Sequence, residues 1–196
     1  LWRKAEIAAF KTIGYNFTEE MCIKTMGMRI DEVVHYWWEK FKWSSVSEEM
    51  VVNDIHSKMI DLIKSEGAIL SGVEKTLKLL KNENIPLALA SSSSKVLIET
   101  VLNVLNIKSY FTIVHSAQGE IAGKPDPSVF LTTAKLLGMA PEKCLVLEDS
   151  KAGMEAGLSA NMRTIVVPEK NTCPEWSTNA FTKLNSMNDF SIELLK

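Results

Sequence analysis

The sequence predicts an α/β protein with a Rossmann-like parallel sheet core and a small all-helical domain attached to it. Residues 1–66 contain amphipathic segments of helical period and no convincing strand. From Ile69 onward, short apolar runs alternate with helical segments, which is typical of a parallel sheet covered on both faces. One such run, residues 144–147, stops abruptly at Glu148 and Asp149, and ligands of open α/β sheets bind at the carboxyl ends of the strands. We therefore expect a helical domain at 1–66 and an α/β domain at 67–196.

The helical domain is predicted from apolar residues that recur at helical spacing and from start and stop signals. A first helix runs from Leu1 to Ile13 and ends at Gly14, and Thr18-Glu19-Glu20 marks the start of a second. Two further amphipathic segments cover 31–42 and 47–65, and Gly67 ends the last one.

Aromatic and basic residues interleave between Tyr36 and Trp43. Such a stretch can stack on single-stranded bases or lie at a membrane interface. Aromatic residues at helical spacing more often form a core, and we favour that interpretation because the segment is short and the chain carries a net charge of −2. Lysine and arginine are spread along the chain and no apolar run approaches the length of a membrane span, so we expect neither a nucleic-acid nor a membrane partner.

The composition is that of an ordinary globular protein, with 46% hydrophobic and 23% charged residues. Its three cysteines are scattered, odd in number and without metal-ligand spacing (Cys22, Cys144 and Cys173). We interpret them as reduced thiols and expect a cytoplasmic protein. We also expect a monomer.

The α/β domain is predicted as strands and helices in alternation, with right-handed crossovers. Predicted strands cover 85–90, 111–114, 144–147 and 163–167. Predicted helices cover 74–83, 95–105, 127–137, 152–160 and a last segment near 188–195.

Three polar clusters follow these strands or the loops beside them. Ser91–Ser94 follows the first strand, where hydroxyl and N–H groups can hold an oxyanion, although in isolation we favour a helix cap with a flexible turn. Lys124 lies in Gly-Lys-Pro-Asp-Pro, which can fix a positive charge near a phosphate or simply form a turn. Glu148 and Asp149 offer oxygen ligands for a hard cation, whereas capping by Asp149 or Ser150 explains only one polar residue. Each cluster is a weak signal alone, and their order along one sheet is a stronger one.

With this order, the chain resembles the haloacid dehalogenase-like superfamily of phosphotransferases. Its second motif resembles Leu87–Ser91, its third resembles residues 123–127, and its fourth resembles Leu145–Ser150 with Gly153 and Gly157. Residues 1–66 resemble the small helical cap domain of that family. The resemblance is strongest to the branch of β-phosphoglucomutases and sugar-phosphate phosphatases, and Gly27–Asp31 looks most like the 2-deoxyglucose-6-phosphate phosphatases.

The resemblance implies a function and a set of site residues. It implies a Mg²⁺-dependent phosphatase that hydrolyses a small phosphorylated sugar or polyol, of the hexose-6-phosphate type, through an aspartyl-phosphate intermediate. Ser91 and Lys124 would be catalytic. Ser91, Ser92, Lys124 and Arg29 would contact phosphate or substrate. Asp149 and Glu148 would hold Mg²⁺, and Arg29 could instead be a surface residue that pairs with Asp31 or Glu32.

The chain also departs from the family pattern. The family's Asp-x-Asp motif, which carries the nucleophile and the general acid/base, is absent from the sequence given, and we expect it upstream of Leu1 with the first strand of the sheet. Two alternatives stay open. The chain could be a β-phosphoglucomutase-like mutase that returns the phosphoryl group to another hydroxyl, or a non-catalytic phosphate- or sugar-binding module.

Overall fold

A computed structural model describes residues 1–169 and 175–195. Residues 1–66 form four α-helices and no strand: α1 (Trp2–Thr12), α2 (Glu19–Lys24), α3 (Ile30–Phe41) and α4 (Glu48–Glu66). Thr18 and Ser47 begin α2 and α4 as N-caps, because their hydroxyls accept the N–H of Met21 and Met50 at 3.3 and 3.2 Å. The predicted helix boundaries are therefore confirmed to within a residue or two.

Aromatic side chains form the centre of this helical part. Phe10 stacks on Phe17 with ring centroids 3.7 Å apart, and Trp37 and Trp43 pack edge-on against this pair. The prediction that the aromatic stretch forms core is confirmed for Trp37 and Trp43, which are buried, whereas Tyr36 is exposed. The helical repeat of α3 explains this division, because Val33, Val34 and Trp37 lie on the face of the helix that is turned to the core.

Glu6 is a carboxyl group buried in this apolar core. Its exposed fraction is 7%, and its Oε2 atom has no hydrogen-bond partner among the described residues. Burial raises the pKa of Glu6 from its ordinary 4.5 to about 7, and the Cys22 thiol and the Arg3 guanidinium offset only part of that rise. Glu6 is therefore expected to make stability depend on pH.

We expect the free energy of unfolding to fall as pH rises from about 4.5 to about 7. Because the folded state holds the Glu6 proton more tightly than the unfolded chain does, this contribution is fully present below pH 4.5 and lost above pH 7. A shift of this size corresponds to about 3 kcal/mol across the window. In urea unfolding, Glu6→Gln should have a higher free energy of unfolding than wild type, and the difference should grow from pH 4.5 to pH 7. A difference that does not depend on pH would contradict the assignment. Exposed Glu49 gives the control variant Glu49→Gln.

The α/β part contains five short strands among the described residues. They are β1 (Ala88–Ser91), β2 (Ile113–Ser116), β3 (Leu145–Glu148), β4 (Arg163–Val166) and β5 (Thr182–Lys183). All three pairings are parallel: β1 with β2, β3 with β4, and β4 with β5. The helix α5 (Val73–Asn82) precedes β1, and the helices between the strands are α6 (Lys95–Val104), α7 (Ser128–Leu137) and α8 (Lys151–Ser159). The predicted α/β class with a parallel sheet is thus confirmed.

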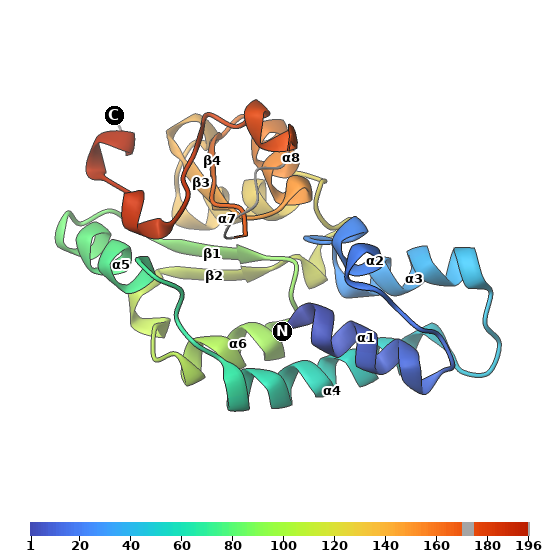
Figure 1. The fold of residues 1–196 in the computed structure, drawn as a ribbon. Helices are drawn as coiled ribbons and strands as arrows, with labels where there is room; N and C mark the ends of the chain where they lie inside the picture. The colour runs from blue at the N-terminus through green and yellow to red at the C-terminus, as the bar shows by residue number, and fades with distance from the viewer. Residues whose placement is uncertain (170–174, 196) are drawn as a thin grey trace.

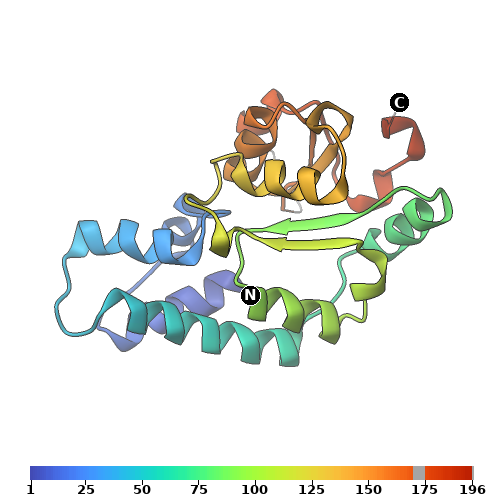
Figure 2. The ribbon, with the colours of Figure 1, turned by 180° about the vertical axis from the view of Figure 1, so that it is seen from behind.

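Helices cover the strands in layers. Figures 1 and 2 show α6 along one face of the β1–β2 pair and α7 on the opposite face, with the long α4 on the far side of α6, against which it packs. Apolar residues from each side fill the layers, including Ile98 and Leu102 below and Val129 and Phe130 above. The arrowheads of β1 and β2 point toward α2 and α3 in Figure 1, so the carboxyl ends of these strands face the helical part.

β1 and β3 each have an edge that no described strand pairs with. β1 bonds only to β2 and β3 only to β4, which leaves a two-stranded and a three-stranded sheet in the described part of the chain. In β4, which is paired on both sides, Thr164, Ile165 and Val166 are fully buried. All four residues of β1 are only partly buried, and Leu147 in β3 is 37% exposed. Apolar strand residues with this much exposure are typical of a sheet edge rather than of the middle of a parallel sheet.

Some predicted boundaries were wrong. The second strand was predicted at 111–114 and lies at Ile113–Ser116, because Ser116 joins the ladder and donates its hydroxyl to Ser93 O at 2.6 Å. The last segment is not an α-helix. It forms two 3₁₀ turns, Met187–Asp189 and Ile192–Leu195, between which Phe190 inserts into the core beside Ile165.

Two further expectations concern cysteines and membranes. Cys22 and Cys144 are free thiols, and Cys173 lies outside the described residues. Among the helices that the structure describes, none has the length and apolarity that a bilayer crossing requires.

Candidate active site

The structure brings Lys124 into contact with the carboxyl ends of two separately paired strands. Its ammonium pairs with the Glu148 carboxylate at the end of β3 and lies 3.4 Å from Ala90 O in β1. It also lies 4.7 Å from the centroid of the Phe130 ring. The side chains of Lys124 and Glu148 are 6% and 9% exposed, so the structure confines two opposite charges in a dry environment.

The loop that carries Lys124 is shaped by its own turn chemistry. Asp126 N donates to Gly123 O at 3.0 Å, and the Asp126 carboxylate accepts Ser128 N at 2.9 Å at the start of α7. Hydrogen bonds from Ser128 lower the pKa of Asp126. The sequence left a plain turn as the alternative for this motif, and the structure shows a turn that also delivers a lysine.

Glu148 and Ser150 are held together where β3 turns into α8. The Ser150 hydroxyl accepts Gly153 N at 3.0 Å and so caps α8, and it donates to Glu148 Oε2 at 3.3 Å. Gly153 allows this close approach, because a Cβ atom there would lie 2.0 Å from Glu148 Oε2. Ser150 therefore performs the capping that the sequence assigned to either Asp149 or Ser150, and Asp149 has no capping task.

Asp149 carries a destabilised charge. Its pKa is raised, first because protein atoms displace water from the carboxyl group and second because the Glu148 carboxylate lies nearby, while Lys124 opposes the shift. The residue still presents surface to solvent, so an ion can reach it. A cation at this point would relieve the repulsion between the two carboxylates.

Asp149 is better placed than Glu148 to bind a hard cation. Both oxygens of Glu148 already have protein partners, Lys124 and Ser150. No group of three or more carboxylate, histidine or cysteine side chains arranged for a metal occurs among the described residues. A Mg²⁺ ion that keeps several waters and uses one or two carboxylates would still be compatible with this pair.

The serines after β1 form a tight turn that faces the helical part. Ser91 Oγ accepts Ser93 N at 3.1 Å, and Ser94 caps α6. The Ser92 hydroxyl donates to Gly27 O, 2.8 Å away in the segment between α2 and α3. The phosphate-binding roles of Ser91 and Ser92 stay predictions, and for Ser92 the hydroxyl is already engaged.

Arg29 lies between the helical part and the α/β part. Its Nε and Nη2 donate to the Asp31 carboxylate at 2.7 and 2.8 Å, and its Nη1 donates to Ala117 O and Glu120 O at 3.2 and 2.9 Å. The side chain is 15% exposed. A substrate contact by Arg29 stays a prediction, and it would have to compete with these bonds. The pairing with Asp31 is the alternative that the sequence left open.

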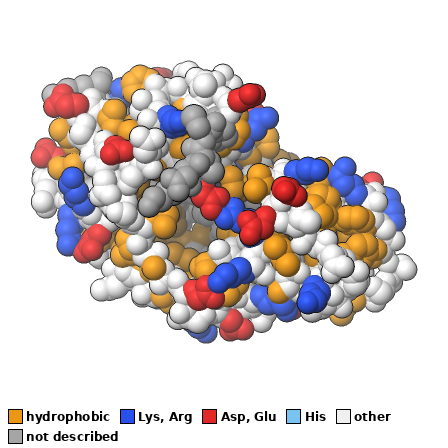
Figure 3. Space-filling model, viewed as in Figure 1, with side chains coloured by type: hydrophobic (Ala, Val, Ile, Leu, Met, Phe, Trp, Pro, Cys, Tyr) orange, Lys and Arg blue, Asp and Glu red, His pale blue; other side chains and the backbone are white. Residues whose placement is uncertain are grey.

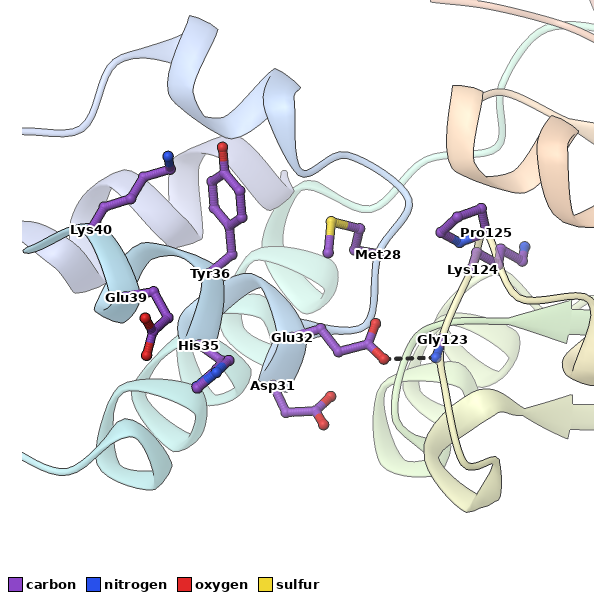
Figure 4. A pocket seen from close by; sticks show the side chains of 10 residues that line it. All are labelled: Met28, Asp31, Glu32, His35, Tyr36, Glu39, Lys40, Gly123, Lys124 and Pro125. Atoms are coloured by element: carbon purple, nitrogen blue, oxygen red, sulfur yellow. Dashed lines mark hydrogen bonds between the residues drawn. The ribbon is translucent and has the colours of Figure 1, made fainter.

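A surface cleft of about 850 Å³ lies beside this site. Its walls come from α3 and from the backbone around Lys124 (Met28, Asp31, Glu32, His35, Tyr36, Glu39, Lys40, Gly123, Lys124, Pro125). Figure 4 shows the Lys124 side chain directed away from the α3 residues of the cleft. Acidic and basic side chains are interspersed over the face drawn in Figure 3, with no large area of one sign.

Sequence reasoning missed two contacts at the site. Glu32 accepts Gly123 N at 2.7 Å, across the boundary between the two parts of the chain. Arg3 makes a two-pronged ion pair with Glu169, which follows β4, at 2.9 and 2.6 Å. A carboxylate three residues after Arg29 and an acidic residue after a predicted strand were the only signals available, and neither identifies its partner.

Comparison with known proteins assigns the family. The family model described as "Haloacid dehalogenase-like hydrolase" matches residues 2–167. The chain belongs to the haloacid dehalogenase-like hydrolase family. The expected resemblance is thereby confirmed.

Its relatives include phosphatases and mutases. The chain is 34% identical to Hexitol phosphatase B of Escherichia coli over 169 residues, which cover 86% of this chain and 76% of that protein. It is 39% identical to β-phosphoglucomutase of Bacillus subtilis over 99 residues, 50% of this chain and 43% of that enzyme. A crystal structure of β-phosphoglucomutase from Clostridium difficile superimposes with a TM-score of 0.85 at 26% identity, and the match covers 99% of this chain and 87% of that one.

Proposed function

We propose that this haloacid dehalogenase-like protein is a Mg²⁺-dependent phosphatase of a small phosphorylated sugar or polyol. The observation that carries the proposal is the buried Lys124–Glu148 pair beside Asp149, a carboxyl group that has lost much of its water but still presents surface to solvent, at the strand ends that face the helical part. The Lys124 ammonium can stabilise an anionic group, and Asp149, which is repelled by Glu148, can bind a metal ion beside it. This combination suits the transfer of a phosphoryl group. The 34% identity to Hexitol phosphatase B supports the substrate class.

The nucleophile is proposed to come from a further parallel strand between β1 and β3. Each of these strands has an edge that no described strand pairs with, and Lys124 contacts both of them, so a strand inserted there would end beside the lysine. An aspartate at that strand end would attack the substrate phosphorus and form an aspartyl-phosphate, which water then hydrolyses. A second carboxyl group would protonate the leaving oxygen.

The residues of this chain have distinct tasks in that reaction. Lys124 stabilises the negative charge that develops on the phosphoryl oxygens, and Ser91 with the N–H groups after it holds those oxygens. Glu148 holds Lys124 in place through their buried ion pair. Mg²⁺, when bound by Asp149 with Glu148 nearby, would neutralise charge between nucleophile and phosphate.

A mutase is the second candidate function. It is favoured by the superposition on the β-phosphoglucomutase of Clostridium difficile. A mutase passes the phosphoryl group from the enzyme to a sugar that keeps its own phosphate, so its site must also hold that second phosphate. Arg29 could supply a cation for it from the helical part, but the Arg29 donors are committed to Asp31, Ala117 and Glu120. We therefore favour the phosphatase.

Product analysis separates the two functions. The full-length protein, given a hexitol 6-phosphate or glucose 6-phosphate and Mg²⁺, should release inorganic phosphate in proportion to substrate lost. We expect ³¹P NMR to show no new sugar phosphate, and removal of Mg²⁺ by a chelator should stop the reaction. With β-glucose 1-phosphate, conversion to glucose 6-phosphate without phosphate release would establish the mutase instead. Binding of phosphate without any turnover would establish a non-catalytic module.

A further inference from the structure

The segment Gly27–Glu32, which we name the clasp segment, runs from the connection between α2 and α3 into the first turn of α3 and touches two loops of the α/β part. Gly27 O accepts the Ser92 hydroxyl in the loop after β1. Arg29 donates to Ala117 O and Glu120 O in the loop after β2. Glu32 accepts Gly123 N, immediately before Lys124, as the dashed line in Figure 4 shows. The clasp segment thus contacts the same loops that carry the proposed chemistry.

Gly123 is held by hydrogen bonds on both sides of its Cα atom. Its N–H donates to Glu32 Oε1 at 2.7 Å, and its carbonyl accepts Asp126 N at 3.0 Å. There is no room for a side chain, because a Cβ atom on Gly123 would lie 2.5 Å from Glu32 Oε2 and 2.9 Å from Arg29 Cβ. The Cα atom of Lys124 follows directly, so its position is fixed by Asp126 from within the loop and by Glu32 from the helical part.

We propose that Glu32 is a positioning residue that holds the Lys124 backbone in place through its bond to Gly123 N. This inference rests on the proposed function. A carboxylate bond to a backbone N–H is charge-assisted and directional, and its partner loop carries a lysine whose usefulness depends on where its ammonium lies. The position of the helical part relative to the α/β part would then determine, through Glu32, where the Lys124 ammonium lies relative to the phosphate.

The first test compares three variants of the full-length protein with a hexitol phosphate and with p-nitrophenyl phosphate. Loss of an oriented hydrogen bond to a charged group predicts a fall in kcat of roughly tenfold to a hundredfold for Glu32→Ala, with KM little changed. Glu32→Gln keeps an acceptor oxygen and should recover most of that loss. Asp61→Ala removes an exposed carboxylate of α4 and should match wild type.

The second test is a double-mutant cycle, which keeps the proposal falsifiable if Glu32→Ala is destabilised. If Glu32 acts through Lys124, then Glu32→Gln and Glu32→Ala should cost little more in a Lys124→Met background. Additive losses, or equal losses for Gln and Ala, would overturn the positioning role. A wild-type protein that hydrolyses no monophosphate would overturn the proposed function together with this inference, whereas an active wild type with Glu32→Ala equal to Asp61→Ala would overturn this inference alone.

Discussion

Lys124→Met should lose both catalysis and stability. Removing an oriented group that stabilises developing charge costs about 10²–10³-fold in kcat. The structure also pairs this lysine with Glu148, and the two side chains are 6% and 9% exposed. Breaking a buried pair by removing one partner leaves an uncompensated charge and costs about 3–5 kcal/mol. The measurements are kcat on a monophosphate and the free energy of unfolding in urea.

A second substitution separates the two effects. Lys124→Met combined with Glu148→Gln removes both charges, so stability should largely return while activity stays lost. Lys151→Met is the matched control, because Lys151 is an exposed lysine in the first turn of α8. If Lys124→Met kept wild-type activity, or if the double variant regained it, Lys124 would be a structural cation and not a catalytic one.

The class of fold was predictable because it depends on hydrophobic period, which the sequence displays directly. The helical start signals at Thr18 and Ser47 reappear within a residue or two, and so does the alternation of strands and helices after Ile69, except for the strand predicted at 85–90, which begins only at Ala88, and the last predicted helix. The strand at Ile113–Ser116 shifted because His115 and Ser116 are polar and looked like loop. Their strand pairing and side-chain hydrogen bonds depend on tertiary structure, which the hydrophobic period of the sequence does not show.

The site was predictable only as a set of chemical types. Glu148, Asp149 and Lys124 stood out because polar residues interrupt apolar strands or sit in a proline turn. Their pairing did not stand out, because Lys124 and Glu148 are 24 positions apart in the sequence and a whole helix lies between them. Glu32 and Gly123 lie 91 residues apart, and a single sequence carries no signal that links them.

Asp149→Asn should abolish Mg²⁺-dependent turnover without loss of fold. We assign Asp149 as the main protein ligand of the ion, because both oxygens of Glu148 have protein partners. Asparagine keeps the size of the side chain but loses the negative charge that a hard cation requires. Turnover with Mg²⁺ should fall to the level seen with chelator, and Glu155→Gln in α8, whose carboxylate pairs with Lys151, provides the control.

The stability of the metal-free Asp149→Asn variant gives an independent readout. The pKa of Asp149 is raised by burial and by Glu148, so its charged form opposes folding at any pH above the ordinary range of a carboxyl group. At neutral pH and without Mg²⁺, the variant should therefore melt at or above the wild-type temperature. This difference in Tm should shrink as the pH falls into the ordinary pKa range of a carboxyl group. Adding Mg²⁺ should raise the Tm of wild type by ligand linkage and leave that of the variant unchanged. A variant that melts lower without metal, or that still responds to Mg²⁺ as wild type does, would show that Asp149 serves the fold and that the ion binds elsewhere.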